Sequence, residues 1–135
     1  MEIRPSDGRQ VLTKYRARQH DIYMGYWGPD YLDPHSNAAA FASNPDNGED
    51  AEQKTLAWRN NWNASGITKA TDDAILIMDP MEREKAYIRL QRRVQSDSPF
   101  IILFQEKSLI ASRESVKGFR VGLTSDQTLY MDIVK

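Results

Sequence analysis

The sequence predicts an α/β fold: a βαβ unit followed by a long loop, two helices and terminal strands. Two observations lead to this prediction. Apolar and aromatic residues, which suit a pleated sheet, run through residues 21–27 and again through residues 100–105. Between residues 21–27 and a shorter apolar segment at residues 1–4, apolar residues recur at helical spacing. The order strand, helix, strand is typical of two parallel strands joined by a right-handed crossover.

The N-terminal elements follow from local signals. We expect a short strand over residues 1–4, which Pro5 ends because proline donates no ladder hydrogen bond. Ser6-Asp7-Gly8 offers an N-cap for a helix that ends near His20. The next strand covers residues 21–27 and ends at Gly28-Pro29, because proline has no N–H to donate to a neighbouring strand.

Residues 28–66 differ from the rest of the chain because they hold three prolines and an acidic cluster at residues 46–50. A loop of this length is usually functional or disordered. Residues 38–42 and 51–58 are each compatible with a short helical turn within it.

The following part has clearer signals. Apolar spacing predicts a helix over residues 67–78, and Asp79-Pro80 with Glu82 predicts the start of another that ends at Ser98-Pro99. Tyr87 belongs to the predicted buried face of this second helix. Residues 100–105 predict a buried strand, residues 108–112 a second strand, and residues 129–134 a weak terminal strand.

Composition limits the function classes. The 135 residues suffice for one modest domain, and the net charge of −1 gives no electrostatic reason to expect nucleic acid or an anionic membrane as a partner. The chain has no cysteine, which excludes disulfides, thiolate zinc sites and a cysteine nucleophile. Met1-Glu2-Ile3-Arg4-Pro5 lacks the apolar region of a secretory signal.

A tryptophan and a carboxylate follow the end of the second predicted strand. Trp27 and Asp30 flank the Gly28-Pro29 turn, and ligands of α/β sheets are held beyond strand ends. An aromatic face beside an ionised carboxylate suits a ligand with an apolar body and a cationic end. Tyr26 and Gly28, on either side of Trp27, complete the candidate ligand site. The alternative interpretation is a core tryptophan followed by a turn aspartate.

The same loop has a second interpretation. Asp30, Asp33 and His35 are compatible with a metal set or with the acid–base groups of a small Asp/His-based hydrolase. A turn with an Asx-type bond to the backbone explains Asp33-Pro34 more simply. The sequence lacks the phosphate-loop, GxSxG and HExxH signatures. We therefore expect no catalytic residues, no metal and no cofactor.

Three segments together carry a resemblance to one family. They are residues 20–34, residues 79–87 followed by Leu90-Gln91 and residues 98–105, and Val116-Lys117-Gly118-Phe119. They resemble the dipeptide/oligopeptide-type extracellular solute-binding proteins of ABC importers. In the C-terminal part of these proteins a strand ends in tryptophan and a turn to aspartate, and an Asp-Pro-x-Glu-Arg helix, a turn, a strand and the tail follow.

The resemblance implies the C-terminal lobe portion of a type II periplasmic-binding-protein fold, with residues 1–106 in the second lobe and residues 107–135 crossing back toward the first. It implies a non-catalytic substrate-binding component of an ABC transporter for peptides or other amine-bearing solutes. Asp30 matches the position that pairs with the α-ammonium group of the ligand, and Trp27 matches the aromatic beside it. Asp33-Pro34 matches a structural motif after the site.

The resemblance also implies partners and a location. The full-length parent is expected in the periplasm or outside the cell, docking on an ABC permease, and this chain corresponds to its last quarter. The first lobe is then missing, so we predict that residues 107–112 and the tail pair with another copy of the chain. A third interpretation is an oligomeric structural fragment without a ligand.

Overall fold

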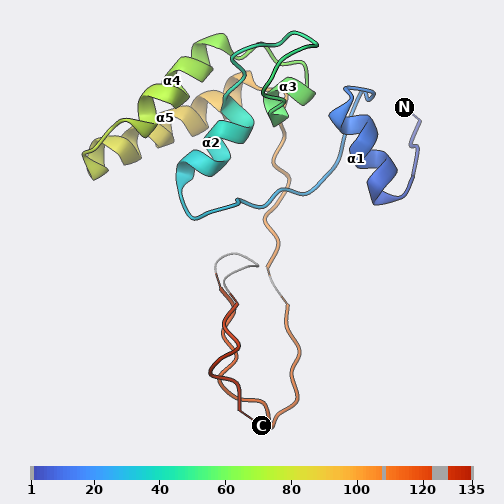
Figure 1. Cartoon of the computed structure of the whole chain (residues 1–135), viewed down its shortest axis with the longest axis vertical. Helices are drawn as coiled ribbons and strands as arrows, with labels where there is room; N and C mark the ends of the chain where they lie inside the picture. Colours follow the sequence, from blue (N-terminus) through green and yellow to red (C-terminus); the bar gives the residue numbers. More distant parts are fainter. Residues whose placement is uncertain (1, 108, 123–127, 135) are drawn as a thin grey trace.

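The computed structural model describes residues 2–107, 109–122 and 128–134 of the chain. Their secondary structure is helical, and the helices follow one another in this order: α1 (Gly8–Arg16), α2 (Pro34–Ala42), α3 (Leu56–Arg59), α4 (Ser65–Ile75) and α5 (Pro80–Asp97). Figure 1 shows α2 to α5 gathered into one body. Helix α1 lies beside them, and an extended connection joins it to α2 (Figure 1). The described residues beyond residue 100 form an arm that leads away from the helices (Figure 1). None of the described helices is both long and apolar enough to cross a membrane.

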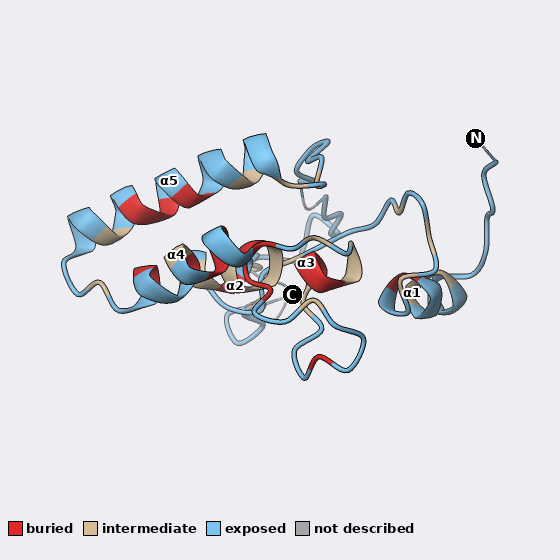
Figure 2. Ribbon diagram, turned by 90° about the horizontal axis from the view of Figure 1, so that it is seen from above, coloured by how far each residue is buried: buried red, intermediate tan, exposed pale blue. Residues whose placement is uncertain are grey.

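The core lies between α2, α4 and α5, whose facing sides carry small and apolar residues. Figure 2 shows the buried positions of α5 on the side that faces α4 and α2. The buried cluster comprises Ala42, Ile67, Ala74, Ala86, Tyr87 and Leu90, with Ala38, Trp62, Ala70, Ile77 and Val94 packed at its edge. The α5 members recur at helical spacing and so share one face, and alanine on each helix lets the backbones approach closely. Tyr87 is 5% exposed, which confirms its predicted burial.

The helix starts agree with the capping signals in the sequence. The Asp79 carboxylate accepts a hydrogen bond from the Glu82 backbone N–H at 2.8 Å, and Pro80 is the first residue of α5. Asp7 caps α1 in the same way by accepting from the Gln10 N–H at 3.0 Å. The helix predicted over residues 67–78 is α4, which begins and ends slightly earlier.

The α/β prediction is wrong, and with it the lobe of a type II periplasmic-binding-protein fold that the resemblance implied. Residues 2–7, 23–29 and 100–107 belong to no strand, so the βαβ unit does not form. Met1 and Ser108, at the ends of two predicted strands, lie outside the described residues. Among the described residues, β-pairing is limited to isolated antiparallel bridges between Lys117 and Val134 and between Arg120 and Leu129.

The physical reason is the lack of a partner strand. A strand needs a neighbour for its backbone N–H and C=O groups and a surface for its apolar face. Met24 and Tyr26 are each 81% exposed, and Ile101 is 83% exposed. The apolar composition of these segments is real, but the described part of the chain supplies no partner strand and leaves most of their apolar side chains exposed. The predicted buried strand at residues 100–105 is therefore an unpaired segment, in which Phe100 is partly buried and residues 101–105 are exposed.

Residues 28–66 are more ordered than the sequence predicted, because they contain α2, α3 and a buried polar network. Asn44 is 2% exposed, and its side-chain amide donates to the Trp62 carbonyl at 2.8 Å and to Asn47 Oδ1 at 2.9 Å. Its backbone N–H donates to Thr68 Oγ1 of α4 at 2.8 Å. One asparagine therefore joins the end of α2 to α4 and to the loop before α3.

Candidate ligand site

The predicted site residues lie on the loop that leads into α2, and the first turns of that helix hold them. The Trp27 indole N–H donates to Asn37 Oδ1 at 2.9 Å. The Asp30 backbone N–H donates to Ser36 Oγ at 3.2 Å. Because Ser36 and Asn37 are consecutive residues of α2, the structure brings Trp27 and Asp30 to the same end of one helix.

Trp27 also belongs to a row of four aromatic rings that leads through Phe41 and Phe100 to Trp62. Its ring meets Phe41 edge-on, with centroids 5.6 Å apart and an interplanar angle of 89°. Phe41 meets Phe100 at 5.0 Å and 75°, and Phe100 meets Trp62 at 6.3 Å and 82°. Such edge-to-face pairs are the favoured arrangement of aromatic rings. Trp27 remains 37% exposed, so its indole is anchored on the protein and still accessible to solvent.

The other predicted site residues differ in how they are placed. Asp30 is exposed, and among the described residues its carboxylate takes part in no salt bridge. Tyr26 is 81% exposed and does not join the aromatic row. Gly28 lies beside the Tyr26 ring, because a Cβ added there would be 3.3 Å from the phenol oxygen. Trp27 and Asp30 are thus both anchored on α2, whereas Tyr26 is an exposed side chain that lies against Gly28.

Asp33 and His35 make contacts with α5 instead of facing Asp30. Asp33 Oδ1 accepts from Arg83 Nη2 at 2.9 Å and from the His35 backbone N–H at 2.7 Å. His35 Nδ1 lies 3.0 Å from the Tyr87 hydroxyl. The hydrogen bond from Arg83, followed by that from the His35 N–H, holds the pKa of the Asp33 carboxyl below its usual range. The Asx-type bond predicted for Asp33 is confirmed.

These contacts speak against the metal or acid–base interpretation. The Asp33 carboxylate is already paired with Arg83 and with the His35 backbone N–H. Burial raises the pKa of Tyr87, which keeps its hydroxyl protonated and available as a hydrogen-bond partner. We conclude that Asp33, His35, Arg83 and Tyr87 serve to fasten α2 to α5.

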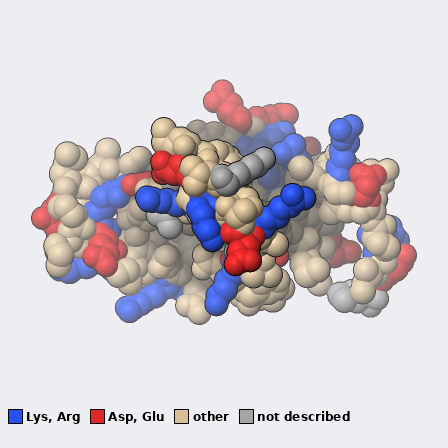
Figure 3. All heavy atoms as spheres, turned by 90° about the horizontal axis from the view of Figure 1, so that it is seen from below, with Lys and Arg blue, Asp and Glu red and all other residues tan. Residues whose placement is uncertain are grey.

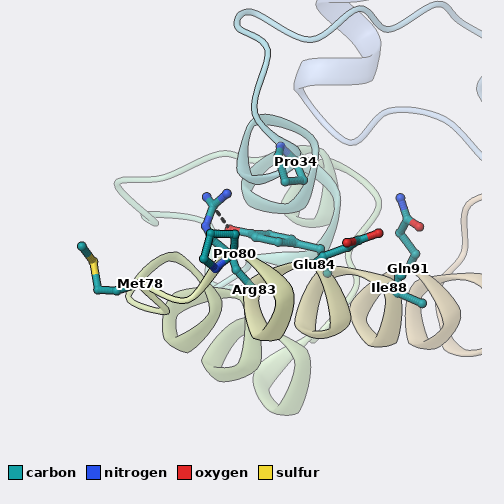
Figure 4. A pocket seen from close by; sticks show the side chains of 8 residues that line it. Pro34, Met78, Pro80, Arg83, Glu84, Ile88 and Gln91 are labelled. Carbon is teal, nitrogen blue, oxygen red and sulfur yellow. Dashed lines mark hydrogen bonds between the residues drawn. The ribbon is translucent and has the colours of Figure 1, made fainter.

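A shallow hollow of about 420 Å³ lies on the outer side of this network. Figure 4 shows Pro34 of α2 above it and Arg83, Glu84 and Gln91 along α5. Neither Trp27 nor Asp30 lines it. On the face drawn in Figure 3, the Lys and Arg side chains are interspersed with Asp and Glu, so no broad field of one sign covers it.

Sequence reasoning missed the groups that position Trp27 and Asp30. Ser36, Asn37 and Phe41 carried no motif, although all three lie on α2, where proline after a capping aspartate already signals a helix start. Phe100 is far away in the chain and was assigned to a strand. Only the packing of the folded chain relates it to Trp27.

The chain is similar to one curated protein, the probable D,D-dipeptide-binding periplasmic protein DdpA of Escherichia coli (strain K12). The two are 28% identical over 101 residues, which are 74% of this chain and 18% of the relative. The chain thus spans less than a fifth of the relative's length. No protein-family model and no solved structure matches the chain.

Proposed function

We propose that this chain contributes to the substrate-binding component of an ABC transporter for peptides or other amine-bearing solutes, without catalysing a reaction. One observation supports the proposal: consecutive residues of α2 accept hydrogen bonds from the Asp30 backbone N–H and from the accessible Trp27 indole, so both residues are anchored at the start of the same helix. The similarity to a D,D-dipeptide-binding periplasmic protein supports a peptide as the ligand class. The full-length parent would act in the periplasm or outside the cell and deliver its ligand to an ABC permease.

The chemistry of the pair fits such a ligand. An α-ammonium group would donate charge-assisted hydrogen bonds to Asp30, which accepts none from a cationic side chain among the described residues. Trp27 would supply apolar area and attract the cation through its ring. Gly28 leaves the backbone next to Trp27 without a side chain, and Tyr26 would add a second ring at the rim. Exclusion of water would strengthen the ion pair, since exposed pairs are weak.

Calorimetric titration of the whole chain tests this proposal. The probe is D-alanyl-D-alanine, and its N-acetyl derivative lacks the ammonium group that Asp30 is proposed to hold. We expect the free dipeptide to bind and the acetylated one to bind roughly tenfold more weakly or not at all. Asp30→Asn, which keeps the shape and removes the charge, should abolish this preference.

The matched control is Asp21→Asn, which removes an equal charge from an exposed position earlier in the same connection. It should leave the affinity unchanged. Equal binding of the two dipeptides, or an Asp30→Asn variant that keeps the wild-type affinity and preference, would reject the proposed role of Asp30. Absence of any binding to the wild-type chain would reject ligand binding by this chain.

A further inference from the structure

A second hollow, of about 800 Å³, lies between the end of α1 and α3, where it is bordered by three cationic side chains. Arg16 and Arg18 come from α1 and the residues after it, and Lys54 comes from the loop before α3. Glu49 is the one acidic residue on this lining, and Trp58 forms part of the floor. Neither Trp27 nor Asp30 borders this hollow.

Arg18 is fixed in this hollow by neutral partners. Its Nε donates to the Trp58 carbonyl at 2.6 Å, and its Nη1 and Nη2 donate to the Asn47 carbonyl at 3.1 Å and to Asn47 Oδ1 at 2.8 Å. The guanidinium carbon lies 3.6 Å from the centroid of the Trp58 ring. A guanidinium has five N–H donors, so two remain after these three bonds.

The backbone at Arg18 shows how much this side chain determines the local structure. Arg18 has φ 58°, the left-handed conformation that glycine normally supplies just after a helix. The Gln19 N–H donates to the Lys14 carbonyl at 2.9 Å and the Arg18 N–H to the Tyr15 carbonyl at 3.2 Å, which are the two bonds of a Schellman motif. An arginine adopts this strained position because its side-chain bonds to Asn47 and Trp58 offset the cost.

The positive charge of Arg18 has no counter-ion within the described part of the chain. The salt bridges among the described residues are made by other cationic side chains, and neither Arg16 nor Lys54 takes part in one. Burial lowers the pKa of Arg18, while the charge of Glu49 acts in the opposite direction from beyond ion-pair distance. Lys54 Nζ lies 4.8 Å from the Trp58 ring centroid, on the same aromatic group as Arg18. A cation held this way gains from an anion that reaches its free donors.

We propose that this hollow binds a small oxyanion, a carboxylate or phosphate group, at Arg18. The planar guanidinium would offer its two unused N–H donors, and Arg16 and Lys54 would add positive charge at the rim. Glu49 opposes the anion and limits the affinity. This site is separate from the one at Trp27 and Asp30, and it does not depend on the function proposed for that one.

The test is a titration of the whole chain at low ionic strength with two probes, inorganic phosphate and succinate, followed by NMR of the backbone amides. We expect saturable shifts at residues 16–18 and 47–58. Saturation by phosphate alone assigns a phosphoryl ligand, and saturation by succinate alone assigns a carboxylate. No saturation by either probe would overturn the proposal.

Charge variants decide whether the site is specific. Lys54→Gln should weaken binding roughly threefold or more, and Glu49→Gln should strengthen it by a similar factor. Lys107→Gln is the matched control, because it removes the same charge from an exposed position that does not line the hollow. Equal weakening by Lys54→Gln and Lys107→Gln, or no gain in Glu49→Gln, would show that the probes respond only to net charge. Circular dichroism confirms that each variant is folded.

Discussion

Asp33 and Arg83 are 50 residues apart in the chain, and their side chains form an ion pair in which Oδ1 lies 2.9 Å from Nη2. The same oxygen accepts the His35 backbone N–H at the start of α2. One carboxylate thus caps α2 and fastens it to α5. Because α2 in turn holds Trp27 and Asp30, this contact sets where the candidate ligand site lies on the helical core.

Variants of Asp33 separate its two roles. Asparagine caps a helix about as well as aspartate but has no charge with which to form an ion pair with Arg83, whereas alanine can do neither. We expect Asp33→Ala to be less stable than Asp33→Asn by about 1 kcal/mol, the usual contribution of an N-cap. Urea unfolding followed by circular dichroism measures the difference. Equal stability of the two variants would mean that the cap contributes nothing here, and Asp50→Asn provides the control for loss of one exposed acidic charge.

The stability contribution of the Asp33 carboxylate should depend on pH. Its pKa is lower in the folded chain than in the unfolded one, chiefly because Arg83 donates to it. The contribution is therefore complete above the unfolded pKa of about 3.9 and disappears as the pH falls through the lower folded value. The stability advantage of wild type over Asp33→Asn should shrink over that window, and an advantage that persists below it would contradict this assignment. Carboxyl NMR titration of Asp33 gives the folded pKa directly.

The docking of α1 should depend on the side chain of Arg18. Arg18→Gly and Arg18→Ala both lose the hydrogen bonds to Asn47 and Trp58, but only glycine adopts φ 58° without strain. Alanine should therefore be the less stable of the two by about 1 kcal/mol. Hydrogen exchange of the α1 amides should accelerate in both variants. If exchange stays at the wild-type rate, the side chain is not what holds α1 against α3.

The buried amide of Asn44 should be important for the order of residues 43–62. Asn44→Ala removes the donors to Asn47 and to the Trp62 carbonyl and leaves both acceptors without this partner. We expect a loss of about 1–3 kcal/mol in the free energy of unfolding. Asn63→Ala, at an exposed position nearby, should have little effect in the same urea titration. A similar loss in both variants would argue against a special role for the buried network.

The sequence was informative where local chemistry decides the structure. Asp7 and Asp79 marked the starts of α1 and α5, and the apolar spacing around Ile67 found α4. It failed where the outcome depends on distant partners. An apolar run such as residues 21–27 has strand composition, but whether it pairs depends on a neighbouring strand that its own residues do not encode.

The candidate site shows the same difference between features that follow from local sequence and features that depend on distant partners. Trp27 and Asp30 were identified from a turn and from residue types alone, and their roles in binding stay predictions. Their actual supports, Ser36, Asn37 and Phe41, depend on how the loop folds back onto α2. The capping bond of Asp33 was predictable because it spans two residues, whereas its partner Arg83 lies on another helix. The proposed boundary between residues 106 and 107 also stays a prediction.

The exposed segment at residues 101–104 has a practical consequence for colloidal behaviour. Ile101, Ile102, Leu103 and Phe104 are 65–83% exposed, uncharged and free of proline. Such a segment is typical of sequences that nucleate intermolecular β-structure, and the nearest charged residues, Glu106 and Lys107, lie beyond its end. We expect the concentration of protein that stays in solution after centrifugation to rise in Leu103→Lys, with unchanged helical circular dichroism. We expect this protein to aggregate at lower concentrations than its helical core alone would indicate.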